Sequence, residues 1–298
     1  MRYATATAFR AALEQRLNTA ARQDQRALGR LRKMVVFDRL LARLLVVAPD
    51  RWIVKGGLAL DLRLGDRART TRDLDLARQD SEEAATTDLI AAQSLDLGDF
   101  FTFEIERQGK MDPDLEGAAV RYHVTAGLDG RRFEDAIIDV GFGDPLVGTP
   151  DRLHGPDFFG FAGFEPIEVP ALPLEQHLAE KVHAYTRTFG GQHPSSRVKD
   201  LIDLVLIRSA ADFEAGRLRH ALDVTFTARG THAIPAALPS PPSSWATVYR
   251  RLATEVGLEP DLATGHRLAA DFLDPVLSGE PEDDARWHAV RGSWRPSQ

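Results

Sequence analysis

The 298-residue sequence contains no cysteine, which excludes disulfides and thiolate metal sites. It also contains no run of eighteen apolar residues and no signal-peptide-like hydrophobic segment near its start, so we expect no membrane partner and a cytoplasmic location. Its nine histidines do not form a His-Glu-x-x-His pattern, and no serine lies in a Gly-x-Ser-x-Gly context. Zinc-protease and serine-hydrolase chemistry therefore have no support.

Charge is distributed unevenly along the chain. The formal net charge is −7, but residues 1–47 hold ten Lys or Arg and only three Asp or Glu. This asymmetry is compatible with a basic face for a polyanion such as RNA. It is equally compatible with arginine-rich helices whose charges are simply solvated.

Two carboxylates stand out in the segment Asp73-Leu74-Asp75-Leu76. The alternation predicts a strand whose leucines face a core, so Asp73 and Asp75 project from its other side. Paired carboxylates of this kind are suitable ligands for Mg²⁺ or Mn²⁺. An isolated Asp-x-Asp is weak support, because acidic pairs are common on protein surfaces.

A double glycine precedes this strand and changes the interpretation. Ile53-Val54 ends an apolar run, Gly56-Gly57 is predicted to turn the chain, and residues 58–64 are predicted to form a short helix. Glycine before a helix lets backbone N–H groups approach a phosphate closely. A metal site and a nucleoside triphosphate (NTP) site are therefore expected next to each other.

The motif Lys-Gly-Gly-x-Ala-Leu, followed by Arg-x-Thr-x-Asp-Leu-Asp-Leu, resembles the AbiEii family of nucleotidyltransferase toxins, which includes the MenT enzymes of mycobacteria. These toxins belong to the polymerase-β-like nucleotidyltransferase superfamily. The resemblance covers about residues 25–208. It implies an α/β (α+β) nucleotidyltransferase fold, with a mixed sheet flanked by helices and a largely helical C-terminal lobe. We expect the lobes to comprise residues 1–165 and 166–298.

Other candidate site residues lie further along the chain. Asp139 lies in the apolar strand 137–140 and could complete the ligand set or deprotonate an acceptor, although it could instead cap the turn at Gly141. Lys181 lies at the edge of an apolar helical stripe, where it could neutralise a triphosphate or extend its amine to water. The family's later motifs map onto Lys181 and Asp203, and Arg197 and Lys199 would suit phosphate contacts.

The resemblance implies transfer of a nucleoside monophosphate from an NTP to RNA, with the 3′ end of tRNA as acceptor and blocked aminoacylation as the result. Asp73, Asp75 and Asp139 are the expected Mg²⁺ or Mn²⁺ ligands, and a neighbouring antitoxin is the expected partner. One alternative is a nucleotidyltransferase acting on a small-molecule or protein hydroxyl, and another is an inactive binding module. The residues expected to contact the nucleotide are Gly56, Gly57, Arg69, Thr71, Lys181, Arg197 and Lys199.

Overall fold

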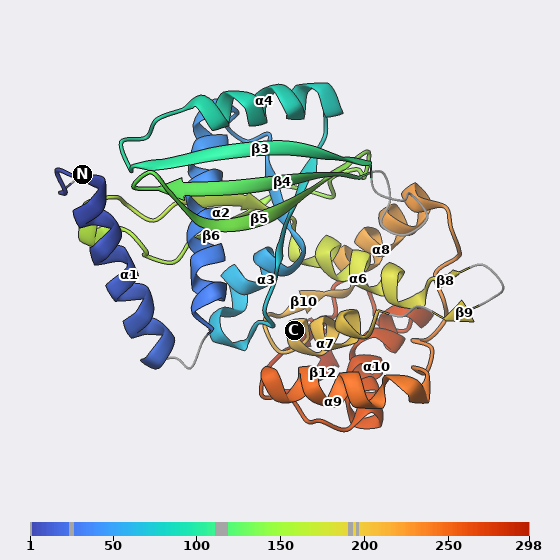
Figure 1. Cartoon of the computed structure of the whole chain (residues 1–298). Coiled ribbons are helices and arrows are strands. Elements are labelled where there is room, and N and C mark those ends of the chain that lie inside the picture. The colour runs from blue at the N-terminus through green and yellow to red at the C-terminus, as the bar shows by residue number, and fades with distance from the viewer. Residues whose placement is uncertain (1, 24–26, 111–118, 190–192, 195–196, 298) are drawn as a thin grey trace. The chain divides into compact units, whose positions relative to one another are not determined.

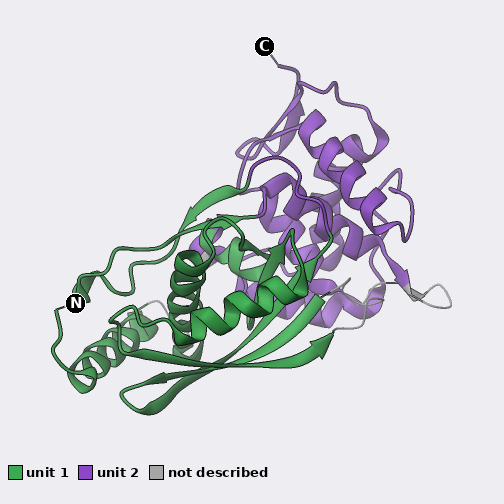
Figure 2. Cartoon of the chain, turned by 90° about the horizontal axis from the view of Figure 1, so that it is seen from above, with its two compact units in different colours: residues 1–62, 70–143, 150–171 green, residues 63–69, 144–149, 172–298 purple. Residues whose placement is uncertain are grey.

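The computed structural model describes residues 2–23, 27–110, 119–189, 193–194 and 197–297. The chain divides into two compact units that alternate along the sequence (Figure 2). The first unit comprises residues 1–62, 70–143 and 150–171, and the second comprises residues 63–69, 144–149 and 172–298. The expected pair of lobes, separated at residue 165, stays a prediction.

A seven-stranded mixed sheet lies at the centre of the first unit (Figure 1), with the strand order β3-β4-β5-β2-β1-β7-β6. The β2–β5 and β1–β7 pairs are parallel, and the other neighbouring pairs are antiparallel. Its strands are β1 (Ile53–Lys55), β2 (Asp73–Arg78), β3 (Phe101–Lys110), β4 (Ala119–Leu128), β5 (Arg131–Phe142), β6 (Asp151–His154) and β7 (Glu168–Ala171).

The helices of this unit explain which face of the sheet is buried. Helix α2 packs against β5 and α4, and α4 packs against β3, so both cover the same face. The side chains that alternate toward these helices are fully buried, as Leu74, Leu76 and Ile138 illustrate. The opposite face is left for polar side chains. The helices are α1 (Ala6–Gln23), α2 (Leu28–Val47), α3 (Gly56–Leu64, whose last two residues belong to the second unit) and α4 (Glu82–Ser94), with a short 3₁₀ turn at Gly160–Ala162. The 3₁₀ turn Gly65–Arg67 that follows α3 belongs to the second unit.

Several expected elements are confirmed in this unit. The scarcity of helix-breaking residues in 5–47 predicts helix, and α1 and α2 lie in that range. Glu82 and Glu83 after Ser81 predict a helix over residues 81–97, and that helix is α4. Ser81 caps α4, since its hydroxyl accepts the N–H of Ala84 at 3.2 Å. Apolar alternation predicts strands at 100–106, 120–124 and 137–140, and these ranges overlap β3, β4 and β5 respectively. Glycines and an Asp-Pro-Asp sequence predict a loop over residues 109–117, which lies mostly outside the described residues, but Gly109 and Lys110 belong to β3.

The second unit is largely helical. Apolar residues at helical spacing predict a helix over residues 174–189, and the helix observed there ends at Thr186. Residues 245–277 also have a helical pattern, and they contain two helices separated by a segment with Gly257 and Pro260. The strands of the C-terminal part were not expected. The elements are α6 (Leu174–Thr186), β8 (Thr188–Phe189), β9 (His193–Pro194), α7 (Val198–Ile207), β10 (Phe213–Glu214), α8 (Ala215–Arg229), a 3₁₀ turn (Ser243–Trp245), α9 (Ala246–Glu255), α10 (Leu262–Ser278), β11 (Arg286–His288) and β12 (Ser293–Arg295).

Candidate active site

Strand β2 carries the Asp-x-Asp pair on the polar face of the sheet. Leu74 and Leu76 are fully buried in the core, whereas Asp73 and Asp75 are partly exposed. This is the alternation expected of a strand with one buried face. The two carboxylates therefore leave the strand on the same side.

A row of four charged residues crosses the sheet at Asp75. In the strand register, Asp75 lies opposite Lys55 of β1 and opposite Asp139 of β5, and Asp139 lies opposite Arg121 of β4. Register partners project from the same face of a sheet. The row therefore places two carboxylates side by side between two cations.

Arg121 holds Asp139 through a bidentate ion pair. Its Nε donates to Asp139 Oδ1 at 2.8 Å, and its Nη2 donates to Oδ2 at 2.7 Å. Asp139 is thus paired within the sheet, and the alternative of a turn-capping role at Gly141 is not needed to explain its burial. Such fork-shaped contacts are among the stronger charge-assisted hydrogen bonds.

The two glycines are required by close packing against this row. A Cβ on Gly56 would lie only 1.8 Å from Asp75 Oδ2, and Gly56 has a φ of +59°, which favours glycine. A Cβ on Gly57 would lie 2.5 Å from the hydroxyl oxygen of Thr71. The expected turn at these glycines is replaced by the first residues of α3, which follows β1 directly.

Thr71 is buried beside Gly57, and its hydroxyl donates to the backbone carbonyl of Asp73 at 3.0 Å. The side chain therefore fixes the chain immediately before β2. A phosphate contact by Thr71 stays a prediction, as do the nucleotide contacts of Gly56 and Gly57.

The donor chemistry of Asp73 and Asp75 fits a hard divalent cation, because both supply carboxylate oxygens from one side of a strand. Among the described residues, no group of three or more His, Cys, Asp or Glu side chains converges closely enough to hold a metal ion. Asp139 would be the third ligand only after a change in its pairing with Arg121. The metal ligand set thus stays a prediction.

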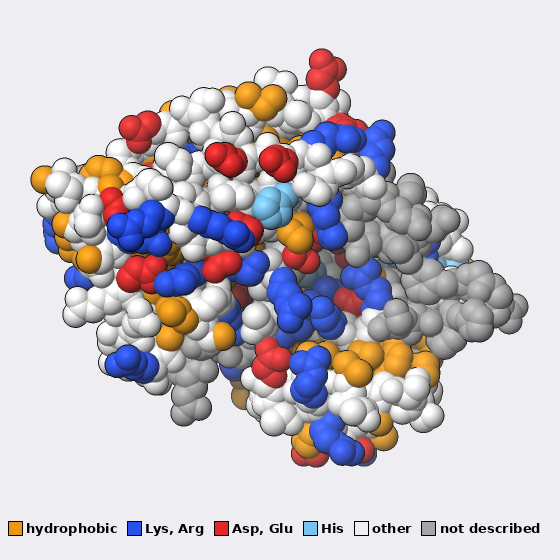
Figure 3. All heavy atoms as spheres, in the orientation of Figure 1, with side chains coloured by type: hydrophobic (Ala, Val, Ile, Leu, Met, Phe, Trp, Pro, Cys, Tyr) orange, Lys and Arg blue, Asp and Glu red, His pale blue; other side chains and the backbone are white. Residues whose placement is uncertain are grey.

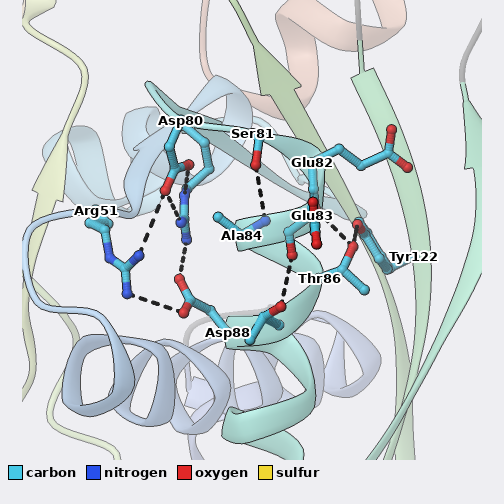
Figure 4. A network of polar contacts seen from close by, with 11 residues as sticks. Arg51, Asp80, Ser81, Glu82, Glu83, Ala84, Thr86, Asp88 and Tyr122 are labelled. Carbon is cyan, nitrogen blue, oxygen red and sulfur yellow. Dashed lines mark hydrogen bonds and ion pairs between the residues drawn. The ribbon is translucent and has the colours of Figure 1, made fainter.

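The end of β2 is anchored by the buried Arg78, whose carboxylate partners Asp80 and Asp88 also face Arg51 (Figure 4). Arg78 donates to Asp80 at 2.7 Å and to Asp88 of α4 at 2.6 Å, and its guanidinium lies 4.3 Å from the ring centroid of Trp52. Arg51 also contacts Asp88, at 3.2 Å. These contacts fix the strand that carries Asp73 and Asp75 against α4.

The second unit contains a separate network around Lys181. Its amine lies 2.9 Å from Asp200 Oδ1 and 2.8 Å from Asp203 Oδ2, so α6 and α7 are joined by two ion pairs. Asp203 also accepts Arg69 Nε at 2.8 Å and Nη2 at 2.9 Å. Lys181 is 8% exposed, and both aspartates are almost completely buried. The alternative in which Lys181 extends its amine to water is therefore wrong.

Mutual attraction keeps this network charged. Burial by itself lowers the pKa of Lys181, but the carboxylates of Asp200 and Asp203 outweigh it and raise the pKa. Burial raises the pKa of Asp203, but Lys181 and Arg69 outweigh it and lower the pKa to about 2. Both groups are thus ionised near neutral pH.

The two remaining basic candidates on α7 differ from each other. Arg197 donates its Nε to Asp200 Oδ2 at 2.7 Å, so it joins the network. Lys199 is exposed. The spacing of polar residues in this helix predicts one polar face for Lys199, Asp200 and Asp203, but the structure leaves Lys199 exposed and buries both aspartates. The contact of Lys199 with phosphate stays a prediction.

Three residues of these networks had no role assigned from the sequence: Lys55, Arg121 and Asp200. Lys55 and Arg121 reach the site through strand register. Only the pairing of β1 with β2, and of β4 with β5, could have identified them. Asp200 could have been found from its position three residues before Asp203, since that spacing places both on one side of a helix.

The basic N-terminal segment contributes fewer free charges than its composition suggests. Arg43 is completely buried and forms a bidentate pair with Asp99, and Arg39 contacts Asp38 within the core. Arg30 pairs with the buried Asp61 at 2.9 Å. On the face shown in Figure 3, Lys and Arg side chains are interspersed with Asp and Glu side chains. Several arginines of residues 1–47 thus stabilise the fold.

In the part of the chain that the structure describes, no helix has the length and apolar character needed to span a membrane.

The comparisons with known proteins agree with this architecture. The sequence matches the family described as nucleotidyl transferase AbiEii toxin, type IV toxin–antitoxin system, over residues 39–291. The structure is similar to MenT4, a nucleotidyltransferase toxin from Mycobacterium tuberculosis H37Rv, with 21% sequence identity, a TM-score of 0.54, and coverage of 89% of this chain and 99% of that one. It also resembles JHP933 from Helicobacter pylori, with 14% identity, a TM-score of 0.47, and coverage of 83% and 94% of the two chains. A comparison with curated protein sequences gave no match. Because the family match spans most of the chain, the protein belongs to the AbiEii family of nucleotidyltransferase toxins.

Proposed function

We propose that this toxin transfers a nucleoside monophosphate from an NTP to an RNA hydroxyl, with the 3′ end of tRNA as acceptor. The observation that carries the proposal is the charged row Arg121–Asp139–Asp75–Lys55, which lies beside the Gly56 backbone. The row combines carboxylates for cation binding with cations for an anionic substrate. Modification of the tRNA 3′ end would block aminoacylation, which accounts for toxicity.

In this proposal Asp73 and Asp75 hold Mg²⁺ or Mn²⁺, and Asp139 assists them. The cation would stabilise charge that develops on the attacking and leaving oxygens. The acceptor oxygen bonds to the α-phosphorus, the bond from that phosphorus to the bridging oxygen breaks, and pyrophosphate leaves. The proton of the acceptor hydroxyl passes to a carboxylate of the row, for which Asp139 is our choice.

The Lys181 network suits an anionic substrate as well. Arg69, Lys181 and Arg197 gather three positive charges around the carboxylates of Asp200 and Asp203. We infer that Lys181 and Arg69 contribute this field to triphosphate binding and that Asp203 orients both. Arg197 and the exposed Lys199 would contact phosphates further from the reacting atoms.

The test is transfer of label from each α-³²P-labelled NTP to total tRNA in the presence of Mg²⁺. Wild-type protein should label tRNA, and Asp75→Asn should lower the rate by about 100-fold or more, the loss typical of a missing electrostatic contact in the transition state. Glu104→Gln is the matched control. Glu104 is an exposed carboxylate on the same sheet face, because its register partner Thr125 alternates with the buried Val124.

The acceptor is tested with tRNA whose 3′-terminal diol has been oxidised by periodate. Loss of labelling on oxidised tRNA, together with reduced aminoacylation of treated intact tRNA, would support the 3′ end. Labelling of a small molecule or protein in place of tRNA would favour the alternative acceptor. Absence of transfer with every NTP and every acceptor would favour an inactive binding module. A cognate antitoxin is the expected partner.

A further inference from the structure

The carboxylate Asp139 is already occupied in the charged row. Both of its oxygens accept hydrogen bonds from Arg121, at 2.8 and 2.7 Å. The side chain of Asp139 is only 9% exposed, whereas that of Arg121 is 37% exposed. Arg121 is therefore the partner that can swing toward solvent, while Asp139 is held by the strand and its surroundings.

The pairing compensates an unfavourable arrangement. Asp75 and Asp139 are register partners on neighbouring parallel strands, and like charges in such positions repel each other. Lys55 approaches from the other side, since its Nζ lies 3.4 Å from the position that a Cβ on Gly141 would occupy. Gly141 lies two residues after Asp139, so its lack of a side chain leaves room for Lys55 on the same face.

A cation and Arg121 would compete for the same carboxylate, that of Asp139. Each stabilises the charged carboxylate, and a bidentate guanidinium uses both oxygens in a fixed fork geometry. A cation held by Asp73 and Asp75 would replace Arg121 as the counter-charge of Asp139. The released guanidinium, still anchored on β4, would then be available to an anionic group.

We propose that Arg121 is a positioning residue. It holds the Asp139 carboxylate away from the cation site and releases this carboxylate when a divalent cation binds. This rests on the proposed function, because it takes Asp73 and Asp75 as the residues that hold the cation. Arg121 thereby sets how tightly the row binds metal.

The first test is made on the wild-type protein. The Nε–H resonance of Arg121, assigned by its loss in Arg121→Lys, is followed by ¹H–¹⁵N NMR during titration with Mg²⁺. We expect this resonance to shift as its bond to Asp139 is lost. The Nε–H of Arg107, which donates to Glu82 at 2.9 Å, is the internal control and should not move. A stationary Arg121 resonance at saturating Mg²⁺ would overturn the proposal.

The second test measures Mn²⁺ affinity by electron paramagnetic resonance, without substrate. Arg121→Met should bind Mn²⁺ about tenfold more tightly than wild type, because a charge-assisted hydrogen bond no longer competes. Arg121→Gln keeps hydrogen-bonding capacity and should show a smaller gain in Mn²⁺ affinity. This variant replaces Arg121→Met in the test if the methionine variant does not fold. Arg107→Met should be unchanged.

The gain should disappear in Arg121→Met/Asp139→Asn. If it persists there, or if Arg121→Met binds no more tightly than wild type, the proposal is wrong. Asp75→Asn separates this failure from that of the proposed function. If Mn²⁺ binding depends on Asp75 but not on Arg121, the proposed role of Arg121 is wrong and the cation site stands. If neither wild type nor any variant binds Mn²⁺, both the proposed cation site and the proposed role of Arg121 are wrong.

Discussion

Asp203→Ala should destabilise the second unit more than Lys181→Met, although the two side chains bind each other. Asp203 is fully buried and accepts both Lys181 and Arg69. Without its carboxylate, Arg69 loses hydrogen bonds of 2.8 and 2.9 Å, and Lys181 keeps only one of its two aspartates. When Lys181 is removed instead, Asp203 keeps Arg69 and Asp200 keeps Arg197.

The magnitudes follow from the number of buried charged contacts that each substitution removes. Removing one partner of a buried ion pair costs about 3–5 kcal/mol, which is the expected loss for Asp203→Ala. Lys181→Met should cost about 1–3 kcal/mol, because each aspartate loses one charged hydrogen bond but keeps an arginine. The difference is large enough to measure in a domain whose total stability is typically about 5–15 kcal/mol.

The assay is urea unfolding followed by tryptophan fluorescence in a Trp52→Phe background. The three remaining tryptophans, at positions 245, 287 and 294, all belong to the second unit, so the signal reports that unit. Asp223→Ala removes an exposed carboxylate from α8 and is the matched control. The reasoning would be refuted if Asp203→Ala unfolded at the same urea concentration as this control, or at a higher concentration than Lys181→Met.

Three further results are expected. The pKa of Asp203 is lowered to about 2 because Lys181 and Arg69 outweigh its burial. The free energy of unfolding of wild type should therefore exceed that of Asp203→Asn above about pH 4, and the difference should disappear as the pH falls toward 2. Urea unfolding at each pH measures this difference. Gly56→Ala should abolish NTP transfer and lower the melting temperature, because its Cβ would lie 1.8 Å from Asp75 Oδ2. Gly29→Ala, in α2 with open space around its Cβ, should instead stabilise by about 0.5–1 kcal/mol. Arg78→Met should destabilise the first unit by about 1–3 kcal/mol in native-state amide hydrogen exchange of β2, since Asp80 and the buried Asp88 each lose a charged hydrogen bond but keep Arg51; the exposed Arg72→Met is the control.

Local patterns were sufficient to predict β2 and its polar face. The strict alternation in Asp73-Leu74-Asp75-Leu76 predicts a strand with one buried face, and the structure confirms this strand. The row across the sheet could not be predicted in the same way. It depends on which strands become neighbours and on their register, and the parallel pairing of β2 with the distant β5 has no signature within either strand.

Charge composition does not identify the role of a single arginine, for a related reason. A count of arginines does not distinguish a solvated guanidinium from one that is buried and paired. Arg43 is completely buried, and it pairs with Asp99, which follows α4 and accepts hydrogen bonds from both of its terminal nitrogens. The C-terminal strands were missed because β11 and β12 have three residues each, too few for any periodicity to be visible. Packing of Trp287 and Trp294 against Phe272 of α10 holds them in place.

The position of Lys181 shows why activity data alone could not establish its role. Two carboxylates spaced by three residues on α7 converge on one amine of α6, and this arrangement stabilises helix packing whatever the chemistry. A variant at Lys181 or Asp203 can thus lose NTP transfer because the second unit loosens. The two causes separate in Lys181→Arg, which keeps the charge but changes its geometry. Retained stability with lost transfer would indicate a direct role toward substrate, and parallel losses of both would indicate a structural one.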